Sequence, residues 1–181
     1  MMRRLSLLVT IREEIRQTRP FPSPPQEVLV ALLRTADLIG RFVDDLIEDN
    51  GITGQQYNVL RILRGAGEKG LPTLDIAERM IEQTPGITRL IDRLEEKGLV
   101  TRERCATDRR QVFCRIGSAG LALLERLDGP VMNAAGEAFG GLKRAEVTQL
   151  IALLDRTRDH VNQQFASREQ KPTQTSTRSL A

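Results

Sequence analysis

Residues 72–116 of this chain, PTLDIAERMIEQTPGITRLIDRLEEKGLVTRERCATDRRQVFCRI, decide its fold. The stretch predicts a helix, a turn, a second helix and then a two-stranded hairpin. Thr84 and Pro85 indicate where the second helix begins, because threonine is a good helix cap and proline is tolerated at the first helical position. Lys97 and Gly98 indicate its end, since a cation in the last turn and a glycine just beyond it are typical of helix C-termini.

The second helix, 84–97, is predicted to have an apolar face and a basic polar face. Its apolar residues recur at i, i+3, i+4 and i+7, so one side of the helix packs on a core. The residues of this apolar face are Ile87, Leu90, Ile91 and Leu94. The residues of the opposite face are Thr88, Arg89, Asp92 and Arg93. A face with two arginines is a candidate for contact with a polyanion, although many such faces are only solvated.

The chain changes to an extended, alternating pattern at residues 99–104 and again at 111–116. Four arginines crowd this small hairpin against only Glu103 and Asp108. These arginines are Arg102, Arg104, Arg109 and Arg110. A phosphate backbone is the natural complement of such a positive finger. The alternative is an ordinary hairpin tip, but an exposed ion pair is worth less than about 1 kcal/mol, so stability is a weak reason for these charges.

The hairpin contains both cysteines of the chain, and we expect them not to form a disulfide within one chain. If Arg104 lies opposite Gln111, then Cys114 lies opposite Thr101, four residues from Cys105. At about 3.3 Å per residue this separation is roughly 13 Å, whereas a disulfide needs α-carbons within about 7 Å. We therefore expect Cys114 to be a small core residue, and any oxidant sensing to depend on Cys105.

At these residues the chain resembles the MarR family of winged helix-turn-helix transcriptional regulators. Residues 88–116 match the recognition helix and wing of that family in residue type and spacing, including the Asp-x-Arg pattern at Asp108 and Arg110. The similarity extends over about residues 23–161. The chain departs from the family pattern directly after the wing, where we expect Ser118 to cap the next helix.

The resemblance implies a sequence-specific DNA-binding regulator that represses a nearby operon. It also implies that a small, often aromatic or anionic, ligand relieves the repression and is held between the dimer helices and the DNA-binding lobe. It places helix 84–97 in the major groove and the wing 99–116 near the minor groove of a palindromic operator. The DNA-binding residues that we predict are Thr84, Thr88, Arg89, Arg93, Arg109 and Arg110. Asp108 is expected to have a structural role in the wing.

Helices on both sides of this core carry more apolar surface than the core can cover. In the segment 23–50 apolar residues recur at alternating spacings of three and four, which is typical of a seam against a partner helix. The residues of this seam are Leu29, Leu32, Ala36, Ile39, Val43 and Leu46. We therefore expect a homodimer built from 23–50 and 118–165, with the winged helix-turn-helix domain at 51–117 and a disordered polar tail at 166–181.

Smaller signals complete the expected fold, which is mainly α with a small β wing. Thr53 and Gln56 form a capping box at the start of a helix. Leu71 adds a short strand to the wing. The N-terminal arm, 1–22, contains a short amphipathic helix at residues 3–18, where a basic start and an apolar run only superficially imitate a signal peptide.

Composition agrees with this fold class. The chain has 181 residues, of which 40% are hydrophobic and only 3% aromatic, so the core must be built mostly from aliphatic side chains. The excess of 27 basic over 24 acidic residues gives a net charge of +3, which is too small by itself to indicate nucleic acid. Two cysteines give neither a zinc spacing nor a secreted disulfide framework, so we expect a cytoplasmic protein. No apolar run is long enough to span a membrane.

An enzyme is the competing class, and the sequence gives it little support. It contains no nucleophile, zinc, phosphate-loop or dinucleotide motif, so we expect no catalytic residue, no metal and no cofactor. His160 is the only histidine, and it is expected to be structural or exposed. A third class, a winged-helix adaptor that binds an acidic protein, would use the same arginine-rich face. Salt-dependent binding to duplex DNA discriminates between a regulator and an adaptor.

Overall fold

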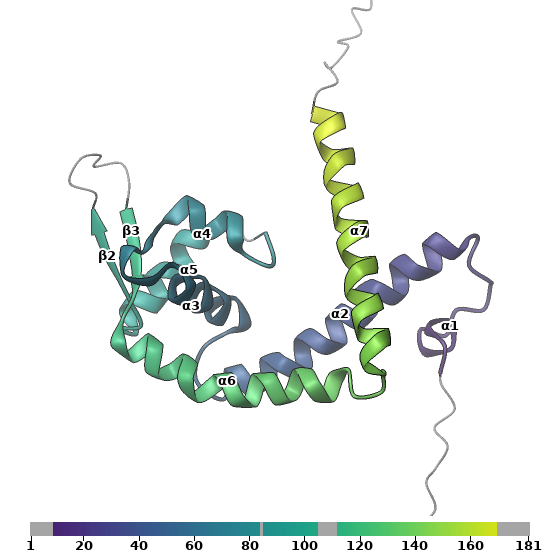
Figure 1. The fold of residues 1–181 in the computed structure, drawn as a ribbon, viewed down its shortest axis with the longest axis horizontal. Helices are drawn as coiled ribbons and strands as arrows, with labels where there is room; N and C mark the ends of the chain where they lie inside the picture. Colours follow the sequence, from purple (N-terminus) through teal and green to yellow (C-terminus); the bar gives the residue numbers. More distant parts are fainter. Residues whose placement is uncertain (1–8, 84, 105–111, 170–181) are drawn as a thin grey trace, which may run out of the picture. The chain divides into compact units, whose positions relative to one another are not determined.

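The computed structural model describes residues 9–83, 85–104 and 112–169 (Figure 1). Two compact units make up the chain, Met1–Ala135 and Gly136–Ala181. The helices of the chain are α1 (Ile11–Glu14), α2 (Pro24–Glu48), α3 (Gly54–Ala66), the 3-10 helix η1 (Gly67–Lys69), α4 (Thr73–Arg79), α5 (Ile87–Glu96), α6 (Ser118–Ala138) and α7 (Arg144–Glu169). The strands are β1 (Leu71–Pro72), β2 (Val100–Arg104) and β3 (Val112–Ile116). The predicted fold class, mainly α with a small β wing, is confirmed.

The hydrophobic core lies where α3, α4 and α5 pack against the small sheet. Figure 1 shows these helices beside the strands, in the blue to teal part of the chain. Helix α3 supplies its centre, because one face of that helix is completely buried. The residues of this face are Gln56, Tyr57, Val59, Leu60 and Leu63. The predicted capping box is confirmed, since the Thr53 hydroxyl accepts a hydrogen bond from the Gln56 amide and the Gln56 side chain accepts one from the Thr53 amide.

The three strands form an antiparallel sheet in the order β1–β3–β2. The predicted strand at Leu71 is confirmed, and Leu71 lies opposite Cys114. The predicted register of the hairpin is wrong by one residue, because Arg104 lies opposite Val112 and Cys114 lies opposite Arg102. The observed register puts the buried residues Val100 and Cys114 on the same side of the sheet, whereas the predicted one would have turned an exposed threonine inward.

Helix α5 begins later than the sequence predicts. Its first helical residue is Ile87, and Pro85 lies before the helix instead of inside its first turn. Gly86 separates the two, with a φ of 115° that side chains rarely tolerate. The helix ends as predicted, since Gly98 follows Lys97 with a φ of 68°. Thr84 lies outside the described residues.

The amphipathic helix predicted for residues 3–18 is mostly absent from the described part of that segment. Within residues 9–18, Ile11–Glu14 is the only helical stretch, and Arg16 takes a left-handed conformation with a φ of 54°. The side chain of Arg12 donates to the carbonyl oxygens of Gln17 and Thr18, at 3.2 and 2.9 Å. These bonds fold the chain back on the single helical turn, so that the helix stops there.

Helices α6 and α7 each differ from the prediction at one end. Helix α6 passes through Pro130, and Ser118 is its first residue instead of a cap before it. Gly120 allows α6 to approach the wing, because a β-carbon there would lie 2.5 Å from the Leu99 carbonyl oxygen. Helix α7 continues to Glu169, so the first residues of the predicted disordered tail are helical. Residues 170–181 lie outside the described part of the chain.

The flanking helices expose large apolar side chains. On α2, Leu29 is 55% exposed and Leu32 is 41% exposed, whereas Ile47 near its end is buried in the core. Helix α7 has no buried residue and exposes Ile151 and Phe165. No helix within the described ranges is both long and apolar enough to cross a membrane.

Candidate nucleic-acid interface

Helix α5 separates a buried face from a basic exposed face as predicted. Leu90, Ile91 and Leu94 are at most 8% exposed, so the helix is fixed on the core by one side. Arg89 and Arg93 are exposed on the other side, one helical turn apart. Neither arginine has an ion-pair partner among the described residues, so both guanidinium groups are available to an external anion.

The wing arginine Arg102, in contrast, is held in ion pairs. Its NH1 nitrogen lies 2.6 Å from the Asp92 carboxylate, and its Nε donates to the Glu95 carboxylate at 2.7 Å. Hydrogen bonds to Glu95 and Asp92, the former being the larger cause, raise the pKa of Arg102 above its ordinary value. The expectation that Arg102 belongs to a free positive finger is therefore corrected. Arg102 joins strand β2 to helix α5 instead.

The charge of a second wing arginine, Arg115, is also neutralised by a carboxylate of the wing itself. Arg115 of β3 forms an ion pair with Glu103 of β2, and its Nε donates to the Glu68 carbonyl oxygen at 2.9 Å. The sequence did not single out this arginine. Because these bonds join both long strands and η1, they hold the wing to the loop that precedes β1.

Arg104 is the remaining wing arginine within the described residues, and it is exposed without an ion pair among them. It lies two residues beyond Arg102 on β2, so both side chains leave the same face of the sheet. Because Arg102 reaches α5 from this face, Arg104 also belongs to the face of the wing that looks toward α5. The DNA-binding residues predicted from the sequence do not include Arg104, although strand alternation places it on the same face as Arg102.

The predicted DNA-binding residues divide into two groups. Thr88, Arg89 and Arg93 share the exposed face of α5. The other predicted residues, Thr84, Asp108, Arg109 and Arg110, lie outside the described part of the chain, and so does Cys105. Their roles stay predictions.

Two side-chain contacts fix the ends of the helix-turn-helix element. The Ile81 amide donates to Asn58 Oδ1 at 2.9 Å, which attaches the connection between α4 and α5 to helix α3. The Lys97 ammonium group donates to the Gly51 carbonyl oxygen, which attaches the end of α5 to the turn between α2 and α3. The exposed arginines of α5 therefore stand on a helix whose C-terminal end is attached to the turn before α3 and whose buried face lies on the core.

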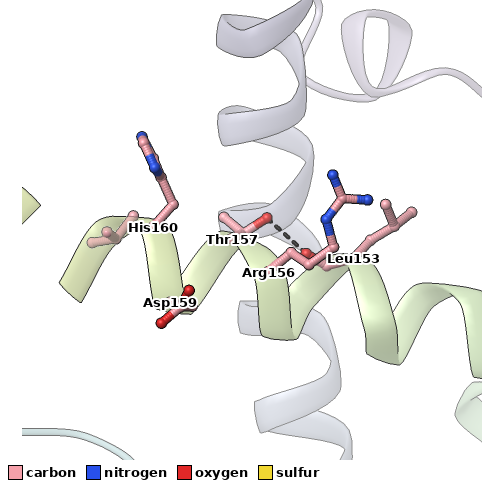
Figure 2. Close-up of a pocket in the computed structure, with 6 residues that line it drawn as sticks. Leu153, Arg156, Thr157, Asp159 and His160 are labelled. Carbon is pink, nitrogen blue, oxygen red and sulfur yellow. Dashed lines mark hydrogen bonds between the residues drawn. The ribbon is translucent and has the colours of Figure 1, made fainter. Parts of the chain in front are cut away.

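The described residues outside this interface offer no better site. They contain no group of three or more histidine, cysteine or acidic side chains that could hold a metal. Figure 2 shows a shallow depression lined by Leu153, Arg156, Thr157, Asp159, His160 and Val161, all from α7 alone. The Thr157 hydroxyl donates to the Leu153 carbonyl oxygen at 2.8 Å, and His160 is exposed as predicted. One side of a single helix cannot enclose a ligand.

Comparisons with known proteins point to one family. The sequence profile of the MarR family matches residues 52–112. The HTH-type transcriptional regulator FarR of Neisseria gonorrhoeae is 27% identical over 146 residues, which cover 79% of this chain and 99% of that protein. The crystal structure of a MarR transcription factor from Planctomyces limnophilus is 39% identical, with a TM-score of 0.59, and the match covers 75% of this chain and 98% of that one.

A further solved structure connects the same fold with an effector. BpsR of Bordetella bronchiseptica is 26% identical, with a TM-score of 0.66, over 73% of this chain and 98% of that one. The DNA binding of BpsR is regulated by 6-hydroxynicotinic acid.

Proposed function

Because the chain belongs to the MarR family of transcriptional regulators, we propose that it binds a palindromic DNA operator as a homodimer and represses transcription until a small ligand relieves it. The family consists of regulators, not enzymes. The observation that carries the proposal is the pair of exposed, unpaired arginines on α5, a helix whose opposite face is buried. DNA is a polyanion whose major groove admits such a helix.

We assign α5 to the major groove and the wing to the neighbouring minor groove. Thr88, Arg89 and Arg93 would face base edges and phosphates, and Arg104 would continue the basic surface from α5 to the wing. Thr84, Arg109 and Arg110 complete the proposed contact set, with Asp108 supporting the wing. The DNA-binding domain in this proposal is 51–117.

The proposed homodimer uses the segments 23–50 and 118–165. Support comes from the exposed leucines of α2 and from the exposed apolar residues of α7, which a second copy would cover. In a two-fold dimer the two α5 helices meet half-sites about one duplex turn apart, roughly 10 base pairs, which makes the operator an imperfect palindrome. The proposed site of action is the cytoplasm.

The proposed effector is a small aromatic or anionic molecule. Its support is the BpsR structure, whose DNA binding is regulated by 6-hydroxynicotinic acid. No residue of this chain is assigned to the effector.

The test is binding of the wild-type protein to a labelled duplex at increasing salt. If six phosphates are neutralised by a dimer, the logarithm of the binding constant should fall with the logarithm of the salt concentration with a slope of about −5. The matched variant is Arg89→Gln with Arg93→Gln, which should flatten this slope. Tight binding to polyglutamate with no binding to duplex DNA would instead establish the adaptor function.

A further inference from the structure

We propose that Arg102 is a positioning residue for DNA binding, which fixes the wing against helix α5 and cancels two carboxylates that would otherwise repel the phosphate backbone. The inference deepens the proposed function and rests on it. It concerns a residue that contacts α5 from the neighbouring strand and makes no contact with DNA itself.

The geometry of Arg102 shows that it faces α5. Arg102 lies opposite Cys114 in the β2–β3 pair, and opposite residues of an antiparallel pair leave the same face of the sheet. Cys114 is fully buried, so this face points toward the core and α5. The guanidinium group reaches Asp92 at 2.6 Å and Glu95 at 2.7 Å, and its side chain is only 29% exposed. One planar group thus holds two carboxylates of one helix.

The charge of α5 explains why this contact matters for DNA. The helix carries two arginines against three carboxylates, so by itself it is net negative. A net negative helix is a poor fit for the major groove, where it approaches two phosphate backbones. Arg102 draws Asp92 and Glu95 into ion pairs and leaves Arg89 and Arg93 unopposed on the exposed face. The basic character of the recognition surface therefore depends on a residue from the wing.

The same contact sets the position of the wing. Arg102 lies in the middle of β2 and forms ion pairs with Asp92 and Glu95 of α5. The strand therefore cannot move away from the helix without breaking both ion pairs. Arg104 lies two residues further along β2, so the same ion pairs also fix its position relative to α5. A lysine at 102 would keep the charge but not the planar fork that reaches both carboxylates.

The first experiment measures the strand attachment without DNA. Arg102→Gln should accelerate backbone amide hydrogen exchange in β2 and β3 at least severalfold and leave the amides of α3 unchanged. Arg102→Lys should give a smaller acceleration, and the matched control Arg104→Gln should give none. Unchanged exchange of the wing strands in Arg102→Gln would overturn the attachment, whatever the protein does with DNA.

The second experiment measures duplex binding in a mutant cycle. Arg102→Gln should weaken binding to operator and random duplex alike, by about tenfold or more. The same change in an Asp92→Asn, Glu95→Gln background should cost several times less, because no carboxylate remains to be cancelled. An equal or larger cost in that background would show that Arg102 contacts DNA directly, which overturns the proposal. If the wild-type protein binds no duplex, the proposed function fails, while the exchange experiment still decides the attachment.

Discussion

At the scale of single residues, we propose that Arg89 is the side chain of α5 that reaches a base. It is exposed near the start of the helix, one residue before the buried Leu90, and it has no ion-pair partner among the described residues. Arg93 lies one turn further on and is suited to a phosphate. The first turns of a recognition helix are the part that enters the major groove most deeply.

We therefore expect Arg89→Ala to cost about 1 to 3 kcal/mol on the specific operator and less on random duplex, because a base contact adds discrimination. Binding to the two duplexes at one salt concentration measures this difference. Arg61→Ala is the matched control, since Arg61 is an exposed arginine that belongs to α3 and lies over the Tyr57 ring. Equal losses on both duplexes would remove Arg89 from base recognition.

Cys114 is predicted to be chemically inert in the folded protein. It is fully buried, burial raises the pKa of its thiol, and its sulfur lies 3.8 Å from the Thr73 hydroxyl. A thiol that stays protonated and inaccessible reacts slowly, so native Cys114 should resist labelling until the protein is unfolded. The predicted absence of a disulfide with Cys105 stays a prediction.

Mild peroxide treatment followed by peptide mapping checks both statements. A Cys105–Cys114 link within one chain would contradict them. Loss of DNA binding that survives Cys105→Ser would contradict oxidant sensing through that residue alone.

At the scale of elements, the sequence predicts those features that depend on local spacing. The capping box at Thr53 and the apolar face of α5 are confirmed, because both follow from neighbours three or four residues apart. The start of α5 and the register of the hairpin are wrong, since Gly86 and the buried side of the sheet decide them through backbone conformation and core packing. The pairing of Arg102 joins a helix to a strand, and no spacing rule indicates such a contact.

A second pairing joins α3 to α6. Arg64 donates two hydrogen bonds to the Asp128 carboxylate, at 2.7 and 3.0 Å, and these bonds lower the pKa of Asp128. A lowered carboxylate pKa stabilises the fold above the ordinary pKa of aspartate, and this stability is lost as the pH falls through the lowered value. Both side chains are partly exposed, so the contribution should be at most about 1 kcal/mol.

We expect Asp128→Asn to lower the melting temperature slightly at neutral pH, and we expect the difference from wild type to vanish in strong acid. Thermal unfolding across this pH range measures it. The control is Asp155→Asn, which removes an exposed pair within α7 alone. A difference that persists unchanged into strong acid would exclude the ion pair as its cause.

At the scale of the whole molecule, the apolar surface of α2 predicts a dimer. Leu29 and Leu32, two consecutive residues of the predicted seam, are exposed in the single chain, and a partner chain would cover them. A deletion of residues 1–50 is not a clean test of this seam, because it also removes the core residue Ile47 and would unfold the protein for that reason alone.

A double substitution tests the dimer without damaging the core. Leu29→Glu with Leu32→Glu should give a folded monomer by light scattering, while the wild type is a dimer. Leu74→Glu is the matched control, because Leu74 is 75% exposed and lies outside the seam. A wild-type chain that is monomeric at micromolar concentration would contradict the dimer and the palindromic operator together.

The most direct test of function is a footprint of the purified wild-type protein on the promoter beside its own gene. Binding through two α5 helices predicts one protected imperfect palindrome with half-sites about one duplex turn apart, roughly 10 base pairs, and protection that disappears as salt is raised. The absence of any protected palindrome at low salt, or protection that is insensitive to salt, would contradict sequence-specific binding through this basic surface.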